Sequence, residues 1–188
     1  MKYGDFVALD FETADYRPDS ACSIGLVKYI NGAECASYYS LIRPPQLYIR
    51  PDFTEIHGLT VDDVKEAPFF SQIWDCSLAP FIGGLPVVCH NAAFDINVLR
   101  AVTSRYALKQ HKINYFCSLK IARKIWPHFP SRALTALAGR FNIVYNAHNA
   151  LDDARVCGKV VTLAAQELAA QNVESLLAKT GLYMQIFP

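Results

Sequence analysis

The first clear pattern along the chain is a strand with hydrophobic residues on both faces. Phe6 and Ala8 alternate with Val7 and Leu9, so residues 5–12 predict a strand that is covered on both sides. Such strands belong in the middle of a sheet that carries helices on both faces. We therefore expect this strand to be central.

Two further strands follow and predict a hairpin. They cover residues 22–30 and 34–42, and Asn31-Gly32 lies between them. Asn-Gly is the strongest short hairpin signal, so the two strands should be antiparallel neighbours.

Helical and extended patterns alternate after a proline-rich loop at 44–51. Trp74, Leu78 and Phe81 lie at helical spacing and predict a helix over 70–82. The other predicted elements are strands at 86–90 and 113–117, helices at 94–107, 118–126, 132–140 and 151–170, and a continuation of the same domain at 171–188. Three strands followed by alternating helices and strands predict a mixed α/β sheet with helices on both faces. We expect one domain spanning residues 1–188.

The composition is that of a globular protein and leaves the function open. Hydrophobic residues make up 52% of the chain and charged residues 19%. The formal net charge is +1 with scattered basic residues, which neither indicates nor excludes nucleic acid. The six cysteines form no C-x-x-C pair, which favours small buried side chains in a reducing compartment. No stretch approaches the roughly 20 apolar residues of a membrane helix. We expect a cytoplasmic protein without a membrane partner.

Four carboxylates carry the chemical signal. Asp10 and Glu12 are two residues apart on the first strand, so both project from one face. Asp95 lies one helical turn before Leu99, which begins the apolar stripe of the helix at 94–107. Asp153 precedes Cys157 in the helix at 151–170 in the same way. Both helical aspartates therefore point toward the sheet.

A single aspartate near a helix start has a simpler explanation, because helix capping and dipole compensation are common there. That explanation weakens for two such helices together with a pair of carboxylates on a strand. Converging carboxylates repel each other unless cations neutralise them. Hard divalent ions with oxygen ligands, magnesium or manganese before zinc, would meet that need.

His148 lies in a loop five residues before Asp153. A lone loop histidine is usually a surface residue or a local hydrogen-bonding partner. Its position ahead of Asp153 lets it reach the same site.

Three segments, read together, indicate a family. VALDFET (7–13), HNAAFD (90–95) and HNALDDA (148–154) resemble, in order and spacing, the three signature motifs of the DEDD exonuclease superfamily. The pattern H-x-A-x-x-D is met by His148, Ala150 and Asp153, and Asn149 stands where the sister subgroup has tyrosine. The chain therefore resembles the histidine subgroup (DEDDh), which includes the proofreading subunits of bacterial DNA polymerase III.

The resemblance implies a ribonuclease H-like fold, a five-stranded mixed sheet with the first strand central. It implies two Mg²⁺ ions, with Mn²⁺ able to substitute. Asp10, Glu12 and Asp153 would hold the metal that activates water, and Asp10 would bridge to the second metal. Asp95 would complete the cluster through coordinated water, and His148 would be the general base.

Five further residues are candidates for substrate binding. Thr13 is either an ordinary strand residue or a partner of the terminal 3′ hydroxyl. Ile56 and His57 resemble the family segment that packs against the terminal nucleotide. Asn91 is a helix N-cap first and a phosphate contact second. Phe94 either stacks on a base or belongs to the core.

The implied activity is a metal-dependent 3′→5′ exonuclease that releases nucleoside 5′-monophosphates from single-stranded ends, with DNA favoured and RNA possible. We expect a free-standing enzyme rather than a stable polymerase partner. The alternatives are a catalytically silent nucleic-acid-binding or protein-interaction module of the same fold and a nucleotide phosphatase. No glycine-rich phosphate loop supports the phosphatase.

Overall fold

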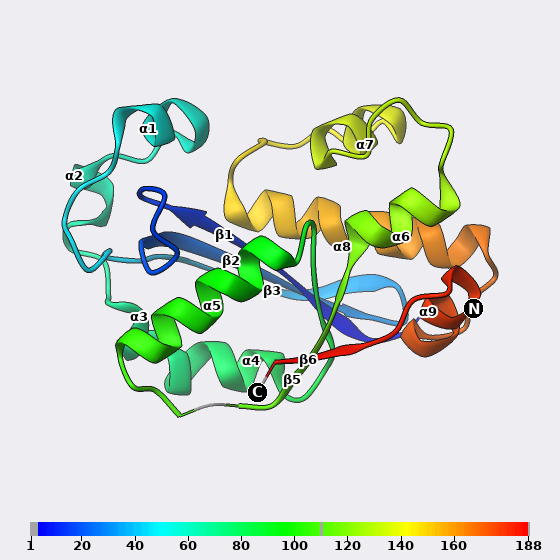
Figure 1. Ribbon diagram of the computed structural model, residues 1–188, viewed down its shortest axis with the longest axis horizontal. Coiled ribbons are helices and arrows are strands. Elements are labelled where there is room, and N and C mark those ends of the chain that lie inside the picture. The colour runs from blue at the N-terminus through cyan, green and yellow to red at the C-terminus, as the bar shows by residue number, and fades with distance from the viewer. Residues whose placement is uncertain (1–3, 110, 188) are drawn as a thin grey trace.

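A six-stranded mixed sheet forms the centre of the computed structural model, which describes residues 4–109 and 111–187 (Figure 1). Its strand order is β3-β2-β1-β4-β5-β6, so the first strand lies inside the sheet as predicted. The strands are β1 (Phe6–Thr13), β2 (Ala21–Ile30), β3 (Ala33–Leu41), β4 (Val87–Cys89), β5 (Ile113–Cys117) and β6 (Gln185–Phe187).

The predicted hairpin is confirmed. β2 and β3 are antiparallel, and Ile30 pairs with Ala33 next to the turn. Asn31 and Gly32 both have positive φ, 55° and 80°, as the tight turn between twisted strands requires. β1 is antiparallel to β2 and parallel to β4, which makes the sheet mixed.

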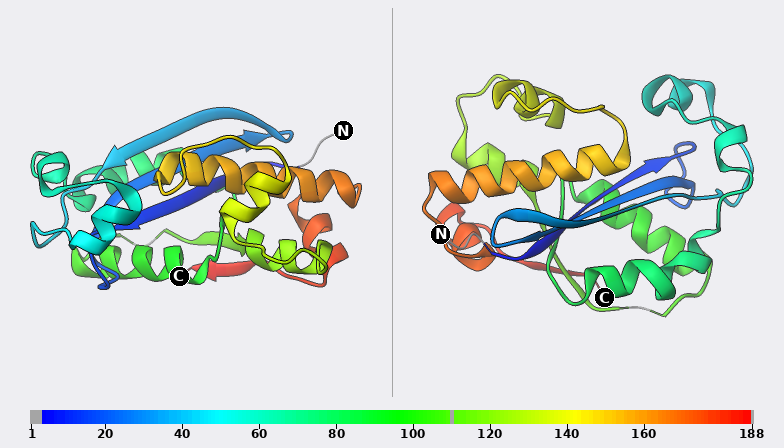
Figure 2. Two further views of the ribbon diagram at one scale, coloured as in Figure 1. Left: turned by 90° about the horizontal axis from the view of Figure 1, so that it is seen from above. Right: turned by 180° about the vertical axis from the view of Figure 1, so that it is seen from behind.

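Helices cover both faces of the sheet. The helical segments are α1 (Pro51–His57), α2 (Val61–Val64), α3 (Phe70–Ile73), the π-helical turn η1 (Trp74–Leu78), α4 (Ala79–Ile82), α5 (Ala93–Arg105), α6 (Ser118–Ile125), α7 (Leu134–Arg140), α8 (Ala150–Glu167) and α9 (Val173–Thr180). Figure 2 shows α8 on one side of the sheet and α4 and α5 on the other. Within the described ranges, no helix has the length and apolar character needed to cross a membrane.

The two faces of β1 belong to two separate cores. Phe6 and Ala8 are fully buried with residues of α6, α7, α8 and α9. Val7 and Leu9 are buried on the opposite face with residues of α3, η1, α4 and α5. The alternation seen in the sequence is therefore the alternation between two hydrophobic layers.

Three details differ from the sequence predictions. The expected five-stranded sheet has a sixth strand, because β6 pairs with β5 at the edge. The helix predicted over 70–82 is interrupted by η1, which directly precedes α4 and its Pro80. Proline has no N–H for the preceding turn and its ring clashes with the carbonyl four residues back, so a wider turn before it relieves the conflict. The helices α1 and α2 lie where no element was predicted.

Two glycines let α8 pack closely across the sheet. A Cβ on Gly25 of β2 would collide with the backbone of Ala150, the first residue of α8. A Cβ on Gly158 of α8 would collide with the ring of Tyr29. The Tyr29 hydroxyl donates a hydrogen bond to the carbonyl of Arg155 at 2.9 Å, which fixes the crossing.

Candidate active site

Asp10 and Glu12 lie at the carboxyl end of β1 on the face that α8 covers. Phe6 and Ala8 precede them on the same face, within the core beneath α8. The partner of Asp10 on the neighbouring strand is Gly25, which has no side chain to fill the space above the sheet. Both carboxylates therefore project into the gap between the sheet and the start of α8.

Asp95 reaches the same end of β1 from α5. Its side chain is 1% exposed, and Oδ1 accepts a hydrogen bond from the backbone N–H of Phe11 at 3.1 Å. The pairing of β1 with β4 stops at Ala8 with Val88, so Phe11 lies past the paired residues. The other oxygen, Oδ2, is buried and has no hydrogen-bond partner among the described residues. A buried oxygen left in this way needs a further partner, which a cation would supply.

Asp153 and His148 complete the cluster from the start of α8. Glu12, His148 and Asp153 each offer one ligand atom, and these atoms lie within 4.8 Å of one another. Asp153 is not the cap of its helix, because Asn149 holds that position and accepts from the N–H groups of Leu151 and Asp152, both at 3.2 Å. The capping explanation therefore does not account for Asp153.

Burial raises the pKa of all four carboxylates, and repulsion from neighbouring carboxylates adds to this at Asp10, Glu12 and Asp95. Burial and repulsion from Asp153 and Asp95 together raise the pKa of Glu12 to about 8. Burial also raises the pKa of Asp95 to about 8. The pKa of Asp10 lies well above its usual range because of burial and then repulsion from Asp95, Asp153 and Glu12. Burial raises the pKa of Asp153, an effect that His148 opposes.

This donor set fits hard divalent cations. None of the four carboxylates forms an ion pair with lysine or arginine in the part of the chain that is described. Carboxylate oxygens are the ligands that magnesium and manganese prefer, whereas zinc prefers nitrogen and sulfur. The cluster and the unpartnered Asp95 oxygen therefore match a site for such ions.

Tyr145 is a residue of this site that the sequence did not reveal. Its hydroxyl oxygen is buried and makes no hydrogen bond within the described residues. Burial raises the pKa of this hydroxyl, and the carboxylates of Asp153 and Asp10 raise it further. The tyrosine comes eight residues before Asp153, and only the folding of the loop before α8 brings the two together.

Two of the predicted substrate residues line one small cavity beside the carboxylates. Thr13 and Phe94 share a cavity of about 150 Å³ with Tyr16 and Phe53. Phe94 is 45% exposed, so it does not belong to the core. Tyr16 and Phe53 meet edge to face, with ring centroids 5.0 Å apart. Neither of these two aromatic residues was predicted.

His57 is held rigidly at the back of this region. Its Nδ1 accepts from the N–H of Leu59 at 3.0 Å, which leaves Nε2–H to donate to the carbonyl of Thr13 at 3.2 Å. Burial lowers the pKa of His57, so this neutral tautomer is favoured. Ile56 is 52% exposed on α1 and lies outside the carboxylate cluster.

Asn91 is not the helix cap that the sequence predicted. The N-cap of α5 is Ala92, and no side chain caps the helix. Asn91 has a positive φ of 70° and lies exposed on the surface. Its side chain is therefore available to a ligand.

Comparison with known proteins identifies the family. The family model RNase_T, whose description is Exonuclease, matches residues 7–161, and these include all four carboxylates and His148. The chain belongs to the RNase T/DEDDh exonuclease family. This DEDDh chain is 31% identical over 172 residues to the DNA polymerase III subunit epsilon of Treponema pallidum, covering 89% of the chain and 79% of that subunit.

Two further matches are to a longer protein and to a solved structure. It is 32% identical over 181 residues to a Mycobacterium tuberculosis protein named as a bifunctional exonuclease/endonuclease. The match covers 90% of this chain but only 28% of that protein. The fold also matches the nuclease domain of 3′hExo, a DEDDh family member bound to rAMP, with a TM-score of 0.76 at 15% identity, over 89% of this chain and 94% of the other.

Proposed function

We propose that this DEDDh exonuclease is a single domain that removes nucleoside 5′-monophosphates from the 3′ end of a single strand, with DNA favoured and RNA possible. The observation that supports this most is the meeting of Asp10, Glu12, Asp95 and Asp153 with His148 at the end of β1. DNA is favoured because relatives of which this chain covers 68% and 79% are named as subunits of DNA polymerase III.

The carboxylates are the proposed metal ligands. Glu12 and Asp153 offer ligand atoms within 4.8 Å of each other and of His148. The carboxylate of Asp10 is close enough to Asp95, Asp153 and Glu12 for each of them to raise its pKa. Asp10, Glu12, Asp95 and Asp153 would hold the two Mg²⁺ ions, Asp95 through water. When bound, a pair of such ions stabilises the attacking and leaving oxygens at phosphorus.

His148 is the proposed general base. Its ring lies in the exposed opening of the cluster, within 4.8 Å of ligand atoms of Glu12 and Asp153. A ring nitrogen takes the proton of the attacking water as the water oxygen bonds to phosphorus and the bond from phosphorus to the 3′ oxygen of the preceding nucleotide breaks. The leaving 3′ oxygen takes a proton from solvent, and His148 returns its proton to solvent. The products are a nucleoside 5′-monophosphate and a strand one nucleotide shorter with a new 3′ hydroxyl.

The terminal nucleotide would lie against the Thr13 and Phe94 cavity. A volume of about 150 Å³ is smaller than the pockets that bury drug-sized ligands, so it suits one base rather than a duplex end. The exposed ring of Phe94 offers a stacking face. His57 holds the Thr13 carbonyl in place, and Ile56 offers an exposed apolar side chain on the neighbouring helix α1.

The test uses single-stranded DNA and RNA that carry a 5′ label. Each strand is incubated with the protein in Mg²⁺, in Mn²⁺ and in EDTA, and Asp10→Asn is compared with Asp62→Asn, a surface aspartate whose side chain is 84% exposed. The proposal predicts a ladder that shortens from the 3′ end, is lost in EDTA and with Asp10→Asn, and persists with Asp62→Asn. An intact strand under every metal condition, with folded protein, would contradict it and favour a binding module.

A further inference from the structure

A groove lined by basic residues begins beside the second motif and extends between α5 and α6. It consists of two adjoining cavities of about 460 and 540 Å³ that share Asn91, Leu119 and Arg123. Four cationic side chains line it, which are Arg100, Lys120, Arg123 and Arg132. No aspartate or glutamate is among the lining residues of either cavity. We call this surface the basic groove.

The cations of the basic groove are unneutralised. None of the four forms an ion pair with a residue that the structure describes, whereas Arg17, Arg50, Arg105 and Arg155 each pair with a carboxylate. The Arg132 Nε is buried and has no hydrogen-bond acceptor in the same part of the chain. The whole chain carries a net charge of only +1, so this concentration of positive charge is a local feature.

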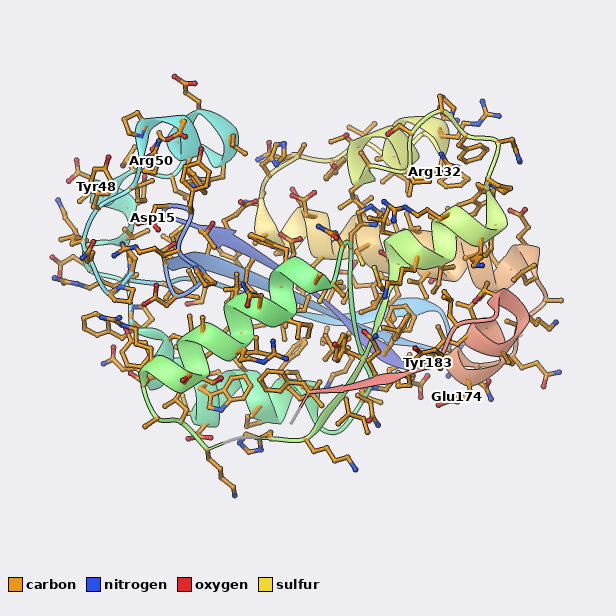
Figure 3. All side chains as sticks on the ribbon, viewed as in Figure 1. Asp15, Tyr48, Arg50, Arg132, Glu174 and Tyr183 are labelled. Atoms are coloured by element: carbon orange, nitrogen blue, oxygen red, sulfur yellow. The ribbon has the colours of Figure 1, made fainter. Side chains whose placement is uncertain are left out.

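Two walls of the groove are helices whose polar groups lie on one side. Asn97 and Arg100 are three residues apart on α5, and Lys120 and Arg123 are three apart on α6. Residues at this spacing share a helix face. Figure 3 shows Arg132 on the segment between α6 and α7. Cationic groups therefore line the groove from three successive parts of the chain.

His90 fixes the walls relative to one another. Its Nε2–H donates to the carbonyl of Arg132 at 2.9 Å, and its Nδ1 accepts from the hydroxyl of Ser118, the first residue of α6, at 2.8 Å. Burial lowers the pKa of His90 to about 4, so the ring stays neutral and keeps this tautomer at pH 7. The groove is thus held in shape before any ligand arrives.

The position of Asn91 links the groove to the active site. Asn91 lines both cavities and lies four residues before Asp95, and Asn97 lines both the groove and the cavity of Thr13 and Phe94. Figure 3 shows Arg132 on the opposite side of the β1 end from Asp15 and Arg50, which flank the terminal-nucleotide region. The groove therefore leads away from the reacting end.

We propose that the basic groove binds the sugar-phosphate backbone of the strand on the 5′ side of the bond that is cut. The inference rests on the proposed exonuclease function and adds the path of the substrate to it. Arginine and lysine side chains bind phosphates through charge-assisted hydrogen bonds. Tyr115 and Leu119 supply the apolar part of the lining, against which bases can rest.

The test compares substrates of different length. Hydrolysis of a dinucleotide and of a 20-nucleotide strand is measured for wild type, Arg123→Gln and Arg100→Gln/Arg123→Gln. Lys65→Gln is the matched control, because Lys65 already pairs with Asp62 at the surface. The proposal predicts that Arg123→Gln raises KM for the long strand about tenfold, the effect of losing one charge-assisted hydrogen bond. The increase for the dinucleotide should be far smaller. Equal effects on both substrates, or none on either, would overturn the proposal.

A binding experiment separates this proposal from the exonuclease itself. Anisotropy of a labelled 20-nucleotide strand in EDTA is measured against salt concentration. Each groove charge removed should lower the slope of log K against log salt by about 0.7, the single-strand value per phosphate contact. If wild type hydrolyses neither substrate but the slope of log K against log salt still falls in Arg123→Gln, the exonuclease proposal is wrong and the proposal that the basic groove binds the strand is supported. An unchanged slope would overturn the groove.

Discussion

Gly25 of β2 and Ala150 of α8 are in backbone contact, so that a Cβ on Gly25 would lie 2.3 Å from the carbonyl oxygen of Ala150. Gly25 is the ladder partner of Asp10, and Ala150 begins the helix that carries Asp153. The absence of a side chain at Gly25 thus sets how closely the Asp153 carboxylate approaches Asp10. Glycine within a strand often marks such a close backbone approach.

Gly25→Ala should therefore damage both stability and catalysis. The inserted methyl group must push the start of α8 away from the sheet, and overpacking of this kind typically costs about 1–3 kcal/mol. We expect a lower Tm and a kcat reduced further than KM is raised. The control is Gly139→Ala in α7, where a Cβ would meet no atom within 4 Å and where alanine favours the helix. A Gly25→Ala enzyme with normal Tm and kcat would contradict the role of this contact.

The raised carboxyl pKa values predict how metal binding depends on pH. Glu12 binds a proton in the folded protein up to about pH 8, whereas its ordinary pKa is 4.5. Since the folded state then binds more protons than the unfolded state, raising the pH through this window destabilises the metal-free protein. A cation that replaces the protons removes this penalty. Saturating Mg²⁺ should therefore raise Tm more at pH 8 than at pH 5.5, as measured by thermal unfolding with Mg²⁺ and with EDTA. If Mg²⁺ raised Tm equally at pH 5.5 and pH 8, or raised it as much in Asp10→Asn as in wild type, the result would argue against a metal site here.

Tyr145→Phe should separate a positioning role from a structural one. The buried hydroxyl has no hydrogen-bond partner among the described residues, so its removal should leave Tm nearly unchanged. If the hydroxyl orients Asp153 in the metal-bound enzyme, its loss should raise the Mg²⁺ concentration for half-maximal activity about 10- to 100-fold. Metal titrations of activity at fixed substrate measure this. A Tyr145→Phe enzyme with wild-type metal dependence would assign the hydroxyl no such role.

Phe94→Ala should weaken substrate binding with little effect on folding. The ring is 45% exposed, so little core packing is lost. Stacking on a base is worth about 1–3 kcal/mol, which corresponds to a rise in KM of roughly 5- to 100-fold. Tyr183→Ala is the control, since Tyr183 is 77% exposed, lies beside α9 (Figure 3) and does not line the cavity that contains Phe94. Equal kinetic effects of the two substitutions would contradict the stacking assignment.

The elements that carry the carboxylates could be predicted from the sequence because each has a strong periodic pattern. β1 alternates between two hydrophobic layers, and α5 and α8 each place an aspartate one turn before an apolar stripe. The short elements could not be predicted. β6 pairs with β5 through only three residues at the sheet edge, and α2 has a single turn. Neither leaves a periodic signal of its own.

The basic groove and the position of Tyr145 could not be predicted from the sequence, because their residues meet their partners only in the folded chain. Arg100, Lys120, Arg123 and Arg132 are dispersed among other charges along the chain, and only the folded structure brings α5, α6 and the segment before α7 to the same two cavities. Gly25 carried a usable signal, since a glycine inside a strand indicates close approach, but its partner in α8 could not be known from the sequence.

Removal of the His148 ring should slow the hydrolysis step itself, which a single-turnover rate measures. A 5′-labelled single strand is mixed with excess enzyme at saturating Mg²⁺, and the loss of the terminal nucleotide is followed for wild type, His148→Ala and His111→Ala. His111 pairs with Asp75 at the surface and serves as the control. The account predicts that His148→Ala slows the step by about 10²–10⁴-fold, the usual contribution of a general base, while His111→Ala keeps the wild-type rate. A His148→Ala rate within about threefold of wild type would lie far below that range and would contradict the account.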